Sequence, residues 1–570
     1  MLVNAVWTLF LLNAFGHFIL VQTISVRVLN GTIIGTLCPS LRVVAYLSIP
    51  YAQPPVGPLR WTAPLMYNSS YPNGVLNASV FSPSCYQYGT ISVETNLYSE
   101  DCLYLNVWAP VNVTINSSLP VKVWIYGGVF YAGSTYDPLY NGCNIATNAI
   151  VVTMNYRVGP LGWLTLNSSL GLTGNYGILD VLMALQWIQD NIASFGGNKT
   201  TVLLFGQSAG ATIAHIISTL PQAASFFSSV IAESGAGRTL LTMQQQATVG
   251  NTFVNALGCS NARNVVECMR KISPTEMIQA TPDNTAILTY LPNRFAPHVD
   301  GKVIPIQPIN TSPKVPFMAG TCTMEGTLLA YFTFIKPEQV TINDYINYLN
   351  ITFGADRVAS ILTVYPISMF NSTLWPAFYA IATVLTDAEY TCPTRRALVT
   401  SLSTKLGTYA FLWNHQPSCP WITSLSANIL SLLGPTHTSE VPFVFGETMQ
   451  LPPPNGTCQM SADEQLLSAQ IIAAWQSMTQ YGYPAFSNGS RWPDWSQRSI
   501  GVQFTRNLTF TVINTTQCDF WDAFQFQNTT NSTGISNNTF STGASMETTC
   551  FGHATAVVAL LTIFFGNLCM

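Results

Sequence analysis

The architecture of this chain follows from the segment Thr201-Val-Leu-Leu-Phe-Gly-Gln-Ser-Ala-Gly-Ala211. Its first five residues predict a buried strand, and residues 209–218 predict the helix that follows. Between them stands the pattern Gly-x-Ser-x-Gly, with Ser208 at its centre. A sharp strand-to-helix turn lifts a serine hydroxyl clear of the backbone, and the helix N-terminus favours negative charge beside it. The segment therefore predicts a nucleophilic Ser208, with the Ala209 amide able to meet a developing oxyanion.

Similar segments surround it and alternate between strand and helix. Apolar residues at steps of three and four predict a helix at Ile178–Phe195, which Gly196 and Gly197 end. Further strands are predicted at Val121–Tyr126, Ile150–Tyr156, Val230–Ala232, Val315–Ala319 and Thr408–Trp413. Strand, crossover helix and strand in succession imply a mainly parallel central sheet that helices cover on both faces, so the fold class is α/β. Because no internal repeat or interior linker is present, residues 26–525 are expected to form one domain.

The composition narrows the class of protein. Of the 570 residues, 48% are hydrophobic, 12% aromatic and only 8% charged. The only long uncharged apolar runs lie at the two ends, which excludes a protein with several membrane spans. The net charge is −4, with 21 Lys and Arg and no basic stripe, and this argues against nucleic-acid binding.

Both ends of the chain have the composition of targeting segments. Residues 1–25 contain an apolar stretch and predict a cleaved signal peptide, with an uncleaved signal anchor as the alternative. Residues 526–545 are rich in Asn, Ser, Thr and Gly and predict a solvated stalk. Residues 546–570 form a spacer and an apolar tail with no basic residue after it. This tail predicts a cleaved GPI-anchor signal and a secreted or cell-surface protein, and a plain membrane helix is the alternative.

Cysteines and glycosylation sequons agree with export. Thirteen Cys in an exported chain predict disulfides rather than metal ligands. No Cys-x-x-Cys or His-Glu-x-x-His motif occurs, so neither a metal site nor a cofactor is expected. We expect N-linked glycans to supply surface polarity that the scarce charges do not. Asn-x-Ser/Thr sequons are abundant, and examples are Asn30, Asn68, Asn77, Asn112, Asn116, Asn167, Asn198, Asn310, Asn350, Asn371, Asn455, Asn488, Asn507 and Asn514.

Histidine is scarce enough for a catalytic base to be sought by elimination. The chain has six His, of which His437 lies in the late loop Leu433–Glu440. Glu325 follows the strand predicted from Val315. Ser208, Glu325 and His437 have the order nucleophile, acid, base that is typical of α/β-hydrolases. The other His are His17 and His553 in the terminal segments, His215 on the helix after Ser208, His298, and His415 at the end of a predicted strand.

Further motifs extend along the chain. They are Ile49-Pro-Tyr-Ala-Gln-Pro-Pro55 with Arg60-Trp61, Ser99-Glu-Asp-Cys-Leu-Tyr-Leu-Asn106, Asn155-Tyr-Arg-Val-Gly159, Gly174-Asn175, and Phe205-Gly-Gln-Ser-Ala-Gly-Ala211. In these motifs the chain resembles the type-B carboxylesterase/cholinesterase family of α/β-hydrolases, over nearly all of the predicted mature chain. The resemblance implies an α/β-hydrolase fold and hydrolysis of a small-molecule carboxylic ester through an acyl-enzyme, without a cofactor.

The resemblance also implies roles for individual residues. Ser208 is the expected nucleophile, Glu325 the acid that orients the base, and His437 the base. The expected oxyanion donors are the backbone amides of Gly128, Val129 and Ala209. Polar groups that surround the family's triad correspond to Gln207, Ser234 and Glu440.

The same resemblance pairs six of the cysteines. The family's three bridges correspond to Cys85–Cys102, Cys259–Cys268 and Cys392–Cys518. An additional Cys419–Cys458 bridge is left open. The partners of Cys38, Cys143 and Cys322 are left open as well.

Departures from the family pattern bear on the substrate. Val129 stands where the family usually has a third Gly, and its branched side chain should crowd the ester pocket. Gln207 stands where cholinesterases have Glu, Leu328 and Leu329 stand where they have aromatic residues, and the Cys85–Cys102 loop contains no Trp. Because quaternary ammonium binding depends on aromatic faces, we expect a general carboxylesterase. A cholinesterase and a catalytically weak, cholinesterase-like adhesion protein are the alternatives.

Overall fold

The structure is a computed structural model that describes residues 24–39, 41–87, 97–166, 170–281, 295–334, 336–495, 499–513 and 515–523. The chain divides into two compact units, residues 1–521 and 522–570. Nearly all of the predicted signal peptide, and the whole of the predicted stalk and tail, lie outside the described residues. Within the described ranges, no helix is both long and apolar enough to cross a membrane.

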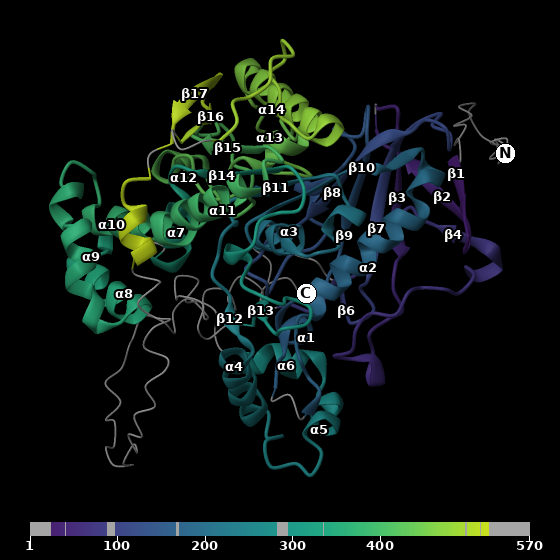
Figure 1. Cartoon of the computed structure of the whole chain (residues 1–570), viewed down its shortest axis with the longest axis horizontal. Helices are drawn as coiled ribbons and strands as arrows, with labels where there is room; N and C mark the ends of the chain where they lie inside the picture. Colours follow the sequence, from purple (N-terminus) through teal and green to yellow (C-terminus); the bar gives the residue numbers. More distant parts are fainter. Residues whose placement is uncertain are drawn as a thin grey trace, which may run out of the picture. The chain divides into compact units, whose positions relative to one another are not determined.

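A mixed β-sheet forms the framework of the first unit (Figure 1). Its strands are β1 (Ile24–Val28), β2 (Gly31–Leu37), β3 (Val43–Pro50), β4 (Val75–Asn77), β7 (Tyr104–Pro110), β8 (Leu119–Ile125), β9 (Ile150–Met154), β10 (Gly197–Gln207), β11 (Ser229–Glu233), β14 (Phe317–Cys322), β15 (Thr408–Trp413), β16 (Ile500–Phe504) and β17 (Leu508–Val512). Their order is β1-β2-β3-β7-β9-β8-β10-β11-β14-β15-β16-β17, and β4 pairs with β2. Two short pairs lie outside this sheet: β5 (Ser84–Cys85) with β6 (Tyr98–Ser99), and β12 (Leu241–Thr242) with β13 (His298–Val299).

The centre of the sheet is parallel. From β9 through β8, β10, β11, β14 and β15 to β16, each neighbouring pair of strands runs in the same direction. Antiparallel strands extend the sheet at both ends. Parallel neighbours need crossover connections, and helices in those connections bury the central strands on both faces. The predicted mainly parallel α/β sheet is therefore confirmed.

Some of the helices cover the two faces of the sheet. The helices of the described residues are α1 (Gly159–Trp163), α2 (Tyr176–Asn191), α3 (Ala209–Thr219), α4 (Met243–Ala256), α5 (Val265–Lys271), α6 (Pro274–Ala280), α7 (Glu325–Phe334), α8 (Ile342–Phe353), α9 (Val358–Val364), α10 (Pro376–Thr386), α11 (Cys392–Ser401), α12 (Ala427–Leu433), α13 (Val441–Phe445) and α14 (Ala462–Tyr481). A π-helical turn, η12 (Asp387–Thr391), joins α10 to α11. Figure 1 shows α13 and α14 on one side of the sheet and α2 and α3 on the other.

Several predicted elements have different limits in the structure, and two of these differences have a local cause. The strand predicted from Val315 begins at Phe317, because the preceding Pro316 has no N–H to donate to a strand ladder. The helix predicted at 178–195 is α2 followed by a 3-10 turn, and Gly196 ends that turn with a φ of 81°. Glycine adopts this left-handed conformation without a steric penalty.

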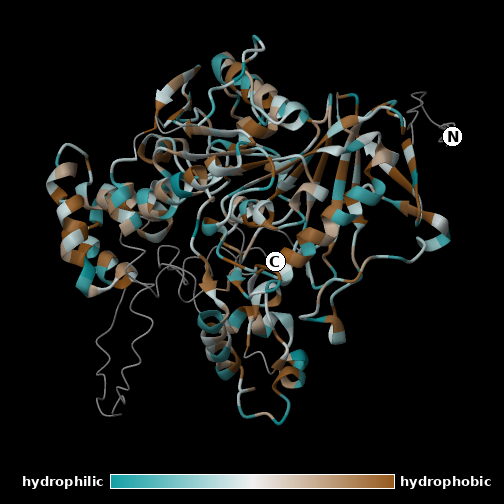
Figure 2. Cartoon of the chain, viewed as in Figure 1, coloured by the Kyte–Doolittle hydropathy of each residue, from teal (hydrophilic) through white to brown (hydrophobic). Residues whose placement is uncertain are grey.

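Aromatic side chains of neighbouring strands build the core beneath α13. The ring centroids of Trp124 in β8 and Phe205 in β10 lie 4.9 Å apart, and Phe445 of α13 lies 5.0 Å from Trp124. All three side chains are fully buried, and Figure 2 shows hydrophobic residues along the central strands. Burying one side chain of this kind stabilises the fold by about 1.5–3 kcal/mol. The cluster therefore holds β8 against β10, just before the turn at the end of β10.

Five disulfides join described residues. Three join the pairs that the resemblance implies, Cys85–Cys102, Cys259–Cys268 and Cys392–Cys518. Two join cysteines that the sequence left open, Cys38–Cys143 and Cys419–Cys458. Cys322 is the free cysteine of the described residues, and it is buried.

Lys122 is an unexpected member of the core. It lies in β8 with 1% of its surface exposed, and none of the ion pairs between described residues includes it. Burial lowers the pKa of its ammonium group from 10.5 to about 7. Between these two pH values the folded chain therefore binds fewer protons than the unfolded chain, and stability rises with pH.

Lys122→Met should raise the melting temperature most below pH 7, because the buried ammonium there costs its full desolvation penalty. The gain should shrink as the pH rises towards 10.5, since the folded wild-type protein then carries a neutral amine. Thermal unfolding at about pH 6, 8 and 10 measures the difference. Lys199→Met changes an exposed lysine and is the control. A gain that is independent of pH would contradict the lowered pKa of Lys122.

Candidate active site

Ser208 stands between β10 and α3 in a strained turn. Its φ of 56° and ψ of −123° lie outside the regions that residues other than glycine usually adopt. A Cβ on Gly210 would lie 2.0 Å from the carbonyl oxygen of Ile125, and a Cβ on Gly206 would lie 2.6 Å from the same atom. Only glycine fits at these two positions, so β8, β10 and α3 pack backbone to backbone. The turn leaves Ser208 partly exposed between buried neighbours.

Glu325 and His437 meet although 112 residues separate them. Glu325 begins α7 directly after β14, and His437 lies in the loop between α12 and α13. His437 Nδ1 lies 2.6 Å from Glu325 Oε2, and Cys322 N donates to Glu325 Oε1 at 2.8 Å. Glu325 is fully buried, and His437 is 5% exposed. A short buried contact of this kind orients an imidazole and decides which ring nitrogen carries the proton.

Thr436 holds the His437 loop against α7. Its hydroxyl oxygen accepts hydrogen bonds from Leu328 N at 2.9 Å and from Thr327 Oγ1 at 2.8 Å. Met324 forms a parallel β-bridge with Thr436. The loop is therefore tied to the segment that carries Glu325, which explains why the acid and the imidazole keep their register.

The imidazole reaches the Ser208 turn through Gln207. Gln207 Nε2 lies 3.3 Å from His437 Nε2 and 3.4 Å from His437 Nδ1. The contact is made by the residue before Ser208, and no hydrogen bond between Ser208 Oγ and His437 is among those of the described residues. Such contacts are often long before substrate binds and tighten in the complex.

The loop after β8 contains three successive residues with positive φ. The values are 114° at Gly128, 58° at Val129 and 68° at Phe130. A Cβ on Gly128 would lie 2.2 Å from the carbonyl oxygen of Ala132, so glycine is required there. Val129 is β-branched, and a left-handed conformation costs it about 1–2 kcal/mol. Outside helices and strands, no main-chain hydrogen bond of the described residues uses the Gly128 or Val129 amide. These amides suit an oxyanion.

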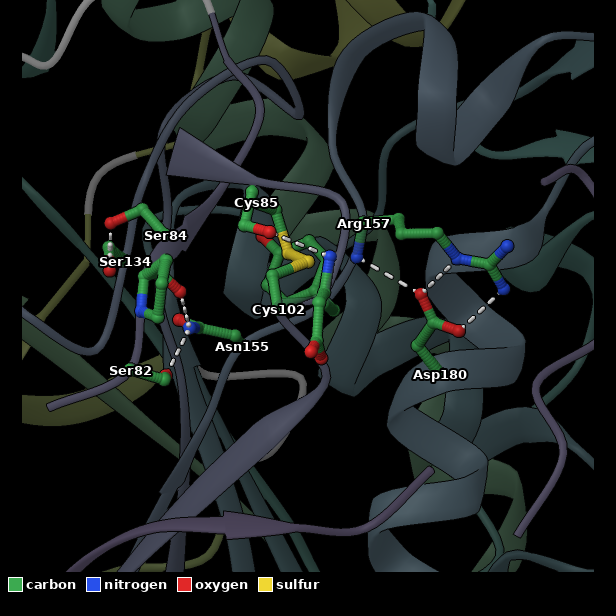
Figure 3. Close-up of a disulfide and its surroundings, with 12 residues drawn as sticks. Ser82, Ser84, Cys85, Cys102, Ser134, Asn155, Arg157 and Asp180 are labelled. Atoms are coloured by element: carbon green, nitrogen blue, oxygen red, sulfur yellow. Dashed lines mark hydrogen bonds and ion pairs between the residues drawn. A yellow bond between two sulfur atoms is a disulfide. The ribbon is translucent and has the colours of Figure 1, made fainter. Parts of the chain in front are cut away.

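Polar contacts link the residues around the Cys85–Cys102 bridge to this loop (Figure 3). Asn155 Oδ1 accepts a hydrogen bond from Thr135 N at 3.0 Å. Asp180 accepts three hydrogen bonds from Arg157, namely from N at 3.0 Å, Nε at 2.8 Å and Nη2 at 2.7 Å. Both side chains of this ion pair are buried. Asn155 therefore binds the segment that follows the loop after β8, and Arg157 ties its own segment to α2.

Two further carboxyl groups lie buried near Glu325. Glu233 Oε1 accepts a hydrogen bond from Trp475 Nε1 at 2.9 Å, and Glu440 Oε2 accepts one from the Cys322 thiol at 3.3 Å. Burial raises the pKa of Glu233 to about 8. Burial, with added repulsion from Glu233 and Glu325, raises the pKa of Glu440 well above its usual value. At neutral pH Glu233 therefore keeps its proton, and burial moves the pKa of Glu440 in the same direction.

Sequence reasoning placed Ser234 and Glu440 around the site but missed the side chain between them. Ser234 Oγ lies 3.9 Å from Cys322 Sγ, and the thiol donates to Glu440. It also missed Tyr390, whose ring centroid lies 4.8 Å from that of His437. Neither Cys322 nor Tyr390 belongs to a motif, so only the folded chain reveals their positions.

The arrangement suits attack by an activated hydroxyl. Ser208 stands at a helix N-terminus, the imidazole of His437 is oriented by a buried carboxyl group, and amides of the loop after β8 lie ready for an anion. These are the parts that nucleophilic acyl transfer requires. Among the described residues, no group of three or more His, Cys, Asp and Glu side chains is placed to hold a metal ion.

Comparisons with known proteins agree with this chemistry. The model of the carboxylesterase family matches residues 22–521. The chain is 30% identical over 557 residues to a cholinesterase of Mus musculus, with 91% of this chain and 89% of that protein covered. It is also 30% identical over 472 residues to a para-nitrobenzyl esterase of Bacillus subtilis (strain 168), with 79% of this chain and 88% of that protein covered. Because the two identities are equal, they do not favour the activity of one relative over that of the other.

Gln207→Glu should change the pH dependence of ester turnover. A carboxylate about 3.3 Å from the ring of His437 would stabilise the protonated imidazole, so less of the neutral imidazole would be present at a given pH. The acid limb of kcat/KM should therefore move up by about 0.5–1 pH unit. Rates with a neutral nitrophenyl ester across the pH range measure the shift. Gln222→Glu adds the same charge at an exposed position and should leave the limb in place. An unshifted limb in Gln207→Glu would show that residue 207 does not act on the imidazole of His437.

Proposed function

Because the chain belongs to the carboxylesterase family and is a serine hydrolase of carboxylic esters, we propose that Ser208, His437 and Glu325 form its catalytic triad. The observation that carries this proposal is the buried 2.6 Å contact between His437 Nδ1 and Glu325 Oε2 beside the Ser208 turn. A carboxyl group on Nδ1 leaves Nε2 for the serine proton. The three residues follow β10, β14 and β15, whose carboxyl ends meet at one edge of the sheet.

In the proposed cycle, His437 Nε2 takes the proton of Ser208 as its Oγ attacks the ester carbonyl carbon. The carbonyl oxygen becomes an oxyanion that the amides of Gly128, Val129 and Ala209 stabilise. Each such donor is typically worth about 10²–10³ in rate. Collapse of the intermediate breaks the bond to the alcohol oxygen, and the imidazolium protonates the leaving alcohol. Water then attacks the acyl-enzyme with the same base, and the carboxylic acid leaves as Ser208 regains its proton.

We propose uncharged esters as the substrate class. Gln207 contributes no negative charge beside the base, and the buried Leu328 and Leu329 at the start of α7 offer no aromatic face. Binding of a quaternary ammonium group uses such faces. A cholinesterase is the alternative, and faster turnover of acetylthiocholine than of simple esters would favour it. A catalytically weak adhesion protein is less well supported, because Ser208, Glu325 and His437 are all present.

We also propose that the protein is exported and glycosylated. Disulfides persist in oxidising compartments, and five of them join described residues. The sequons at Asn68, Asn77 and Asn112 are exposed. Enzymatic deglycosylation should lower the apparent mass and the solubility, and an unchanged mass would exclude N-linked glycans. The proposal of a GPI anchor rests on the sequence of residues 546–570, and release of the protein from membranes by a phosphoinositide-specific phospholipase tests it.

Ser208→Ala should abolish ester hydrolysis and leave the fold intact, because the variant has no hydroxyl to acylate. A loss of about 10⁶-fold in kcat is typical when a triad nucleophile is removed. An organophosphonate probe should label wild-type Ser208, as mass spectrometry of the peptide would show, and should not label the variant. Ser225→Ala changes an exposed serine and is the control. Labelling of Ser208→Ala at another serine would assign the nucleophile elsewhere.

Val129→Gly should widen the range of accepted esters. Removing the branched side chain opens space beside the oxyanion loop, and glycine adopts the φ of 58° without strain. The kcat/KM for bulky acyl groups, relative to acetyl, should rise about 10-fold or more. Nitrophenyl esters of graded acyl bulk measure this, with Val80→Gly at an exposed position as the control. Unchanged relative rates across the series would refute the role of Val129 in selection.

A further inference from the structure

One π-helical turn, η12 (Asp387–Thr391), interrupts the helix formed by α10 and α11. Such turns are rare and appear frequently at functional sites. This one contains Tyr390, which is 5% exposed. Its ring lies against the imidazole of His437, with ring centroids 4.8 Å apart and ring planes inclined by 52°. The turn therefore contacts the proposed catalytic base directly.

A charged pair holds the ring of Tyr390. Arg238 Cζ lies 4.9 Å from the centroid of that ring, and Arg238 Nη1 donates to Glu389 Oε2 at 2.9 Å. The side chains of Arg238 and Glu389 are only 13% and 14% exposed. A largely desolvated cation over an aromatic face is strongly attracted to it. The pair thus joins the segment after β11 to the turn that carries Tyr390.

The turn is also anchored at both of its ends. At its start, Asp387 Oδ2 accepts a hydrogen bond from Tyr365 Oη at 2.8 Å, and that hydroxyl accepts one from Trp521 Nε1 at 2.8 Å. Directly after its end, Cys392 is bonded to Cys518. Because these contacts come from distant parts of the chain, the position of the turn does not depend on the helix alone.

The imidazole of His437 needs a neighbour that restrains its rotation, because a single hydrogen bond fixes the position of one ring atom and not the orientation of the ring plane. The contact between His437 Nδ1 and Glu325 Oε2 leaves the ring free to turn about that axis. Gln207 Nε2 lies 3.3 Å from His437 Nε2 and 3.4 Å from His437 Nδ1, and with Nδ1 bonded to Glu325 it can donate only to Nε2. A flat side chain packed against the imidazole opposes the remaining rotation. A displacement of 1 Å at a catalytic group costs about 10²-fold in rate.

We propose that Tyr390 is a positioning residue that holds the imidazole of His437 in the orientation needed to take the serine proton. The Arg238–Glu389 pair keeps the Tyr390 ring in place. This inference rests on the proposed function of the same site. It assigns the effect to the aromatic ring and not to the phenol hydroxyl, and it predicts a change in kcat and not in KM.

The test compares variants of the full-length protein with a nitrophenyl ester as substrate. Tyr390→Ala should lower kcat by about 10–100-fold and leave KM within about two-fold, because the ring supports the base and not the substrate. Tyr390→Phe keeps the ring and should restore kcat to within about three-fold of the wild-type value. Tyr481→Ala removes an exposed ring that stacks on Tyr483 and is the control.

Two more variants keep the test decisive. Tyr390→Leu retains apolar volume without a flat ring and should stay well below Tyr390→Phe, which also covers the case in which the alanine variant does not fold. Arg238→Met should lower kcat by about 3–10-fold through a looser Tyr390 ring, again at unchanged KM.

Several outcomes would overturn the inference. A raised KM with normal kcat would make Tyr390 a substrate contact, and a leucine variant as active as the phenylalanine variant would show that no ring is needed. An organophosphonate separates this failure from a failure of the proposed function. If wild-type Ser208 is not labelled, the triad is wrong. If it is labelled and Tyr390→Ala turns over normally, only the positioning role is wrong.

Discussion

The backbone contact among β8, β10 and α3 is the constraint on which the site depends. Gly206 and Gly210 lie so close to the carbonyl oxygen of Ile125 that no side chain fits at either position. The chain must therefore pass from strand to helix within one residue, and Ser208 takes a backbone conformation that few residues adopt. Such strain persists only where the surroundings over-determine it. The buried aromatic cluster of Trp124, Phe205 and Phe445 packs β8, β10 and α13 together and so holds the turn in this conformation.

Burial then sets the charge pattern around the imidazole. An uncompensated carboxylate in the interior is expensive, so buried acids either find partners or keep their protons. Glu325 has a partner for each oxygen, His437 on one and the Cys322 amide on the other. Glu233 and Glu440 have one hydrogen-bond donor each, and burial raises the pKa of both. The imidazole therefore contacts the one carboxyl group whose two oxygens both have partners, while burial favours the protonated form of the other two acids.

Much of the sheet could be read from the sequence for a physical reason. Parallel strands buried on both faces appear as short apolar runs, and six such runs became β8, β9, β10, β11, β14 and β15. The limit at Pro316 was missed, because an apolar run does not show where ladder hydrogen bonding begins. The antiparallel strands at the ends of the sheet were missed as well, and only their pairing in space makes them part of it. Lys122 was not predicted to belong to the core, because a single lysine does not break an apolar run, yet the sheet buries its side chain.

By itself, the sequence determined the features that a few adjacent residues encode. The strand-to-helix turn at Ser208 follows from two glycines four positions apart, and the family follows from motifs of five to eight residues. Only the tertiary structure decided which distant groups meet where neither a motif nor the family resemblance marks them. It paired Cys38 with Cys143, put the Cys322 thiol beside Glu440 and laid Tyr390 against His437. Contacts of this kind depend on packing between segments more than 40 residues apart, and local propensity carries no information about them.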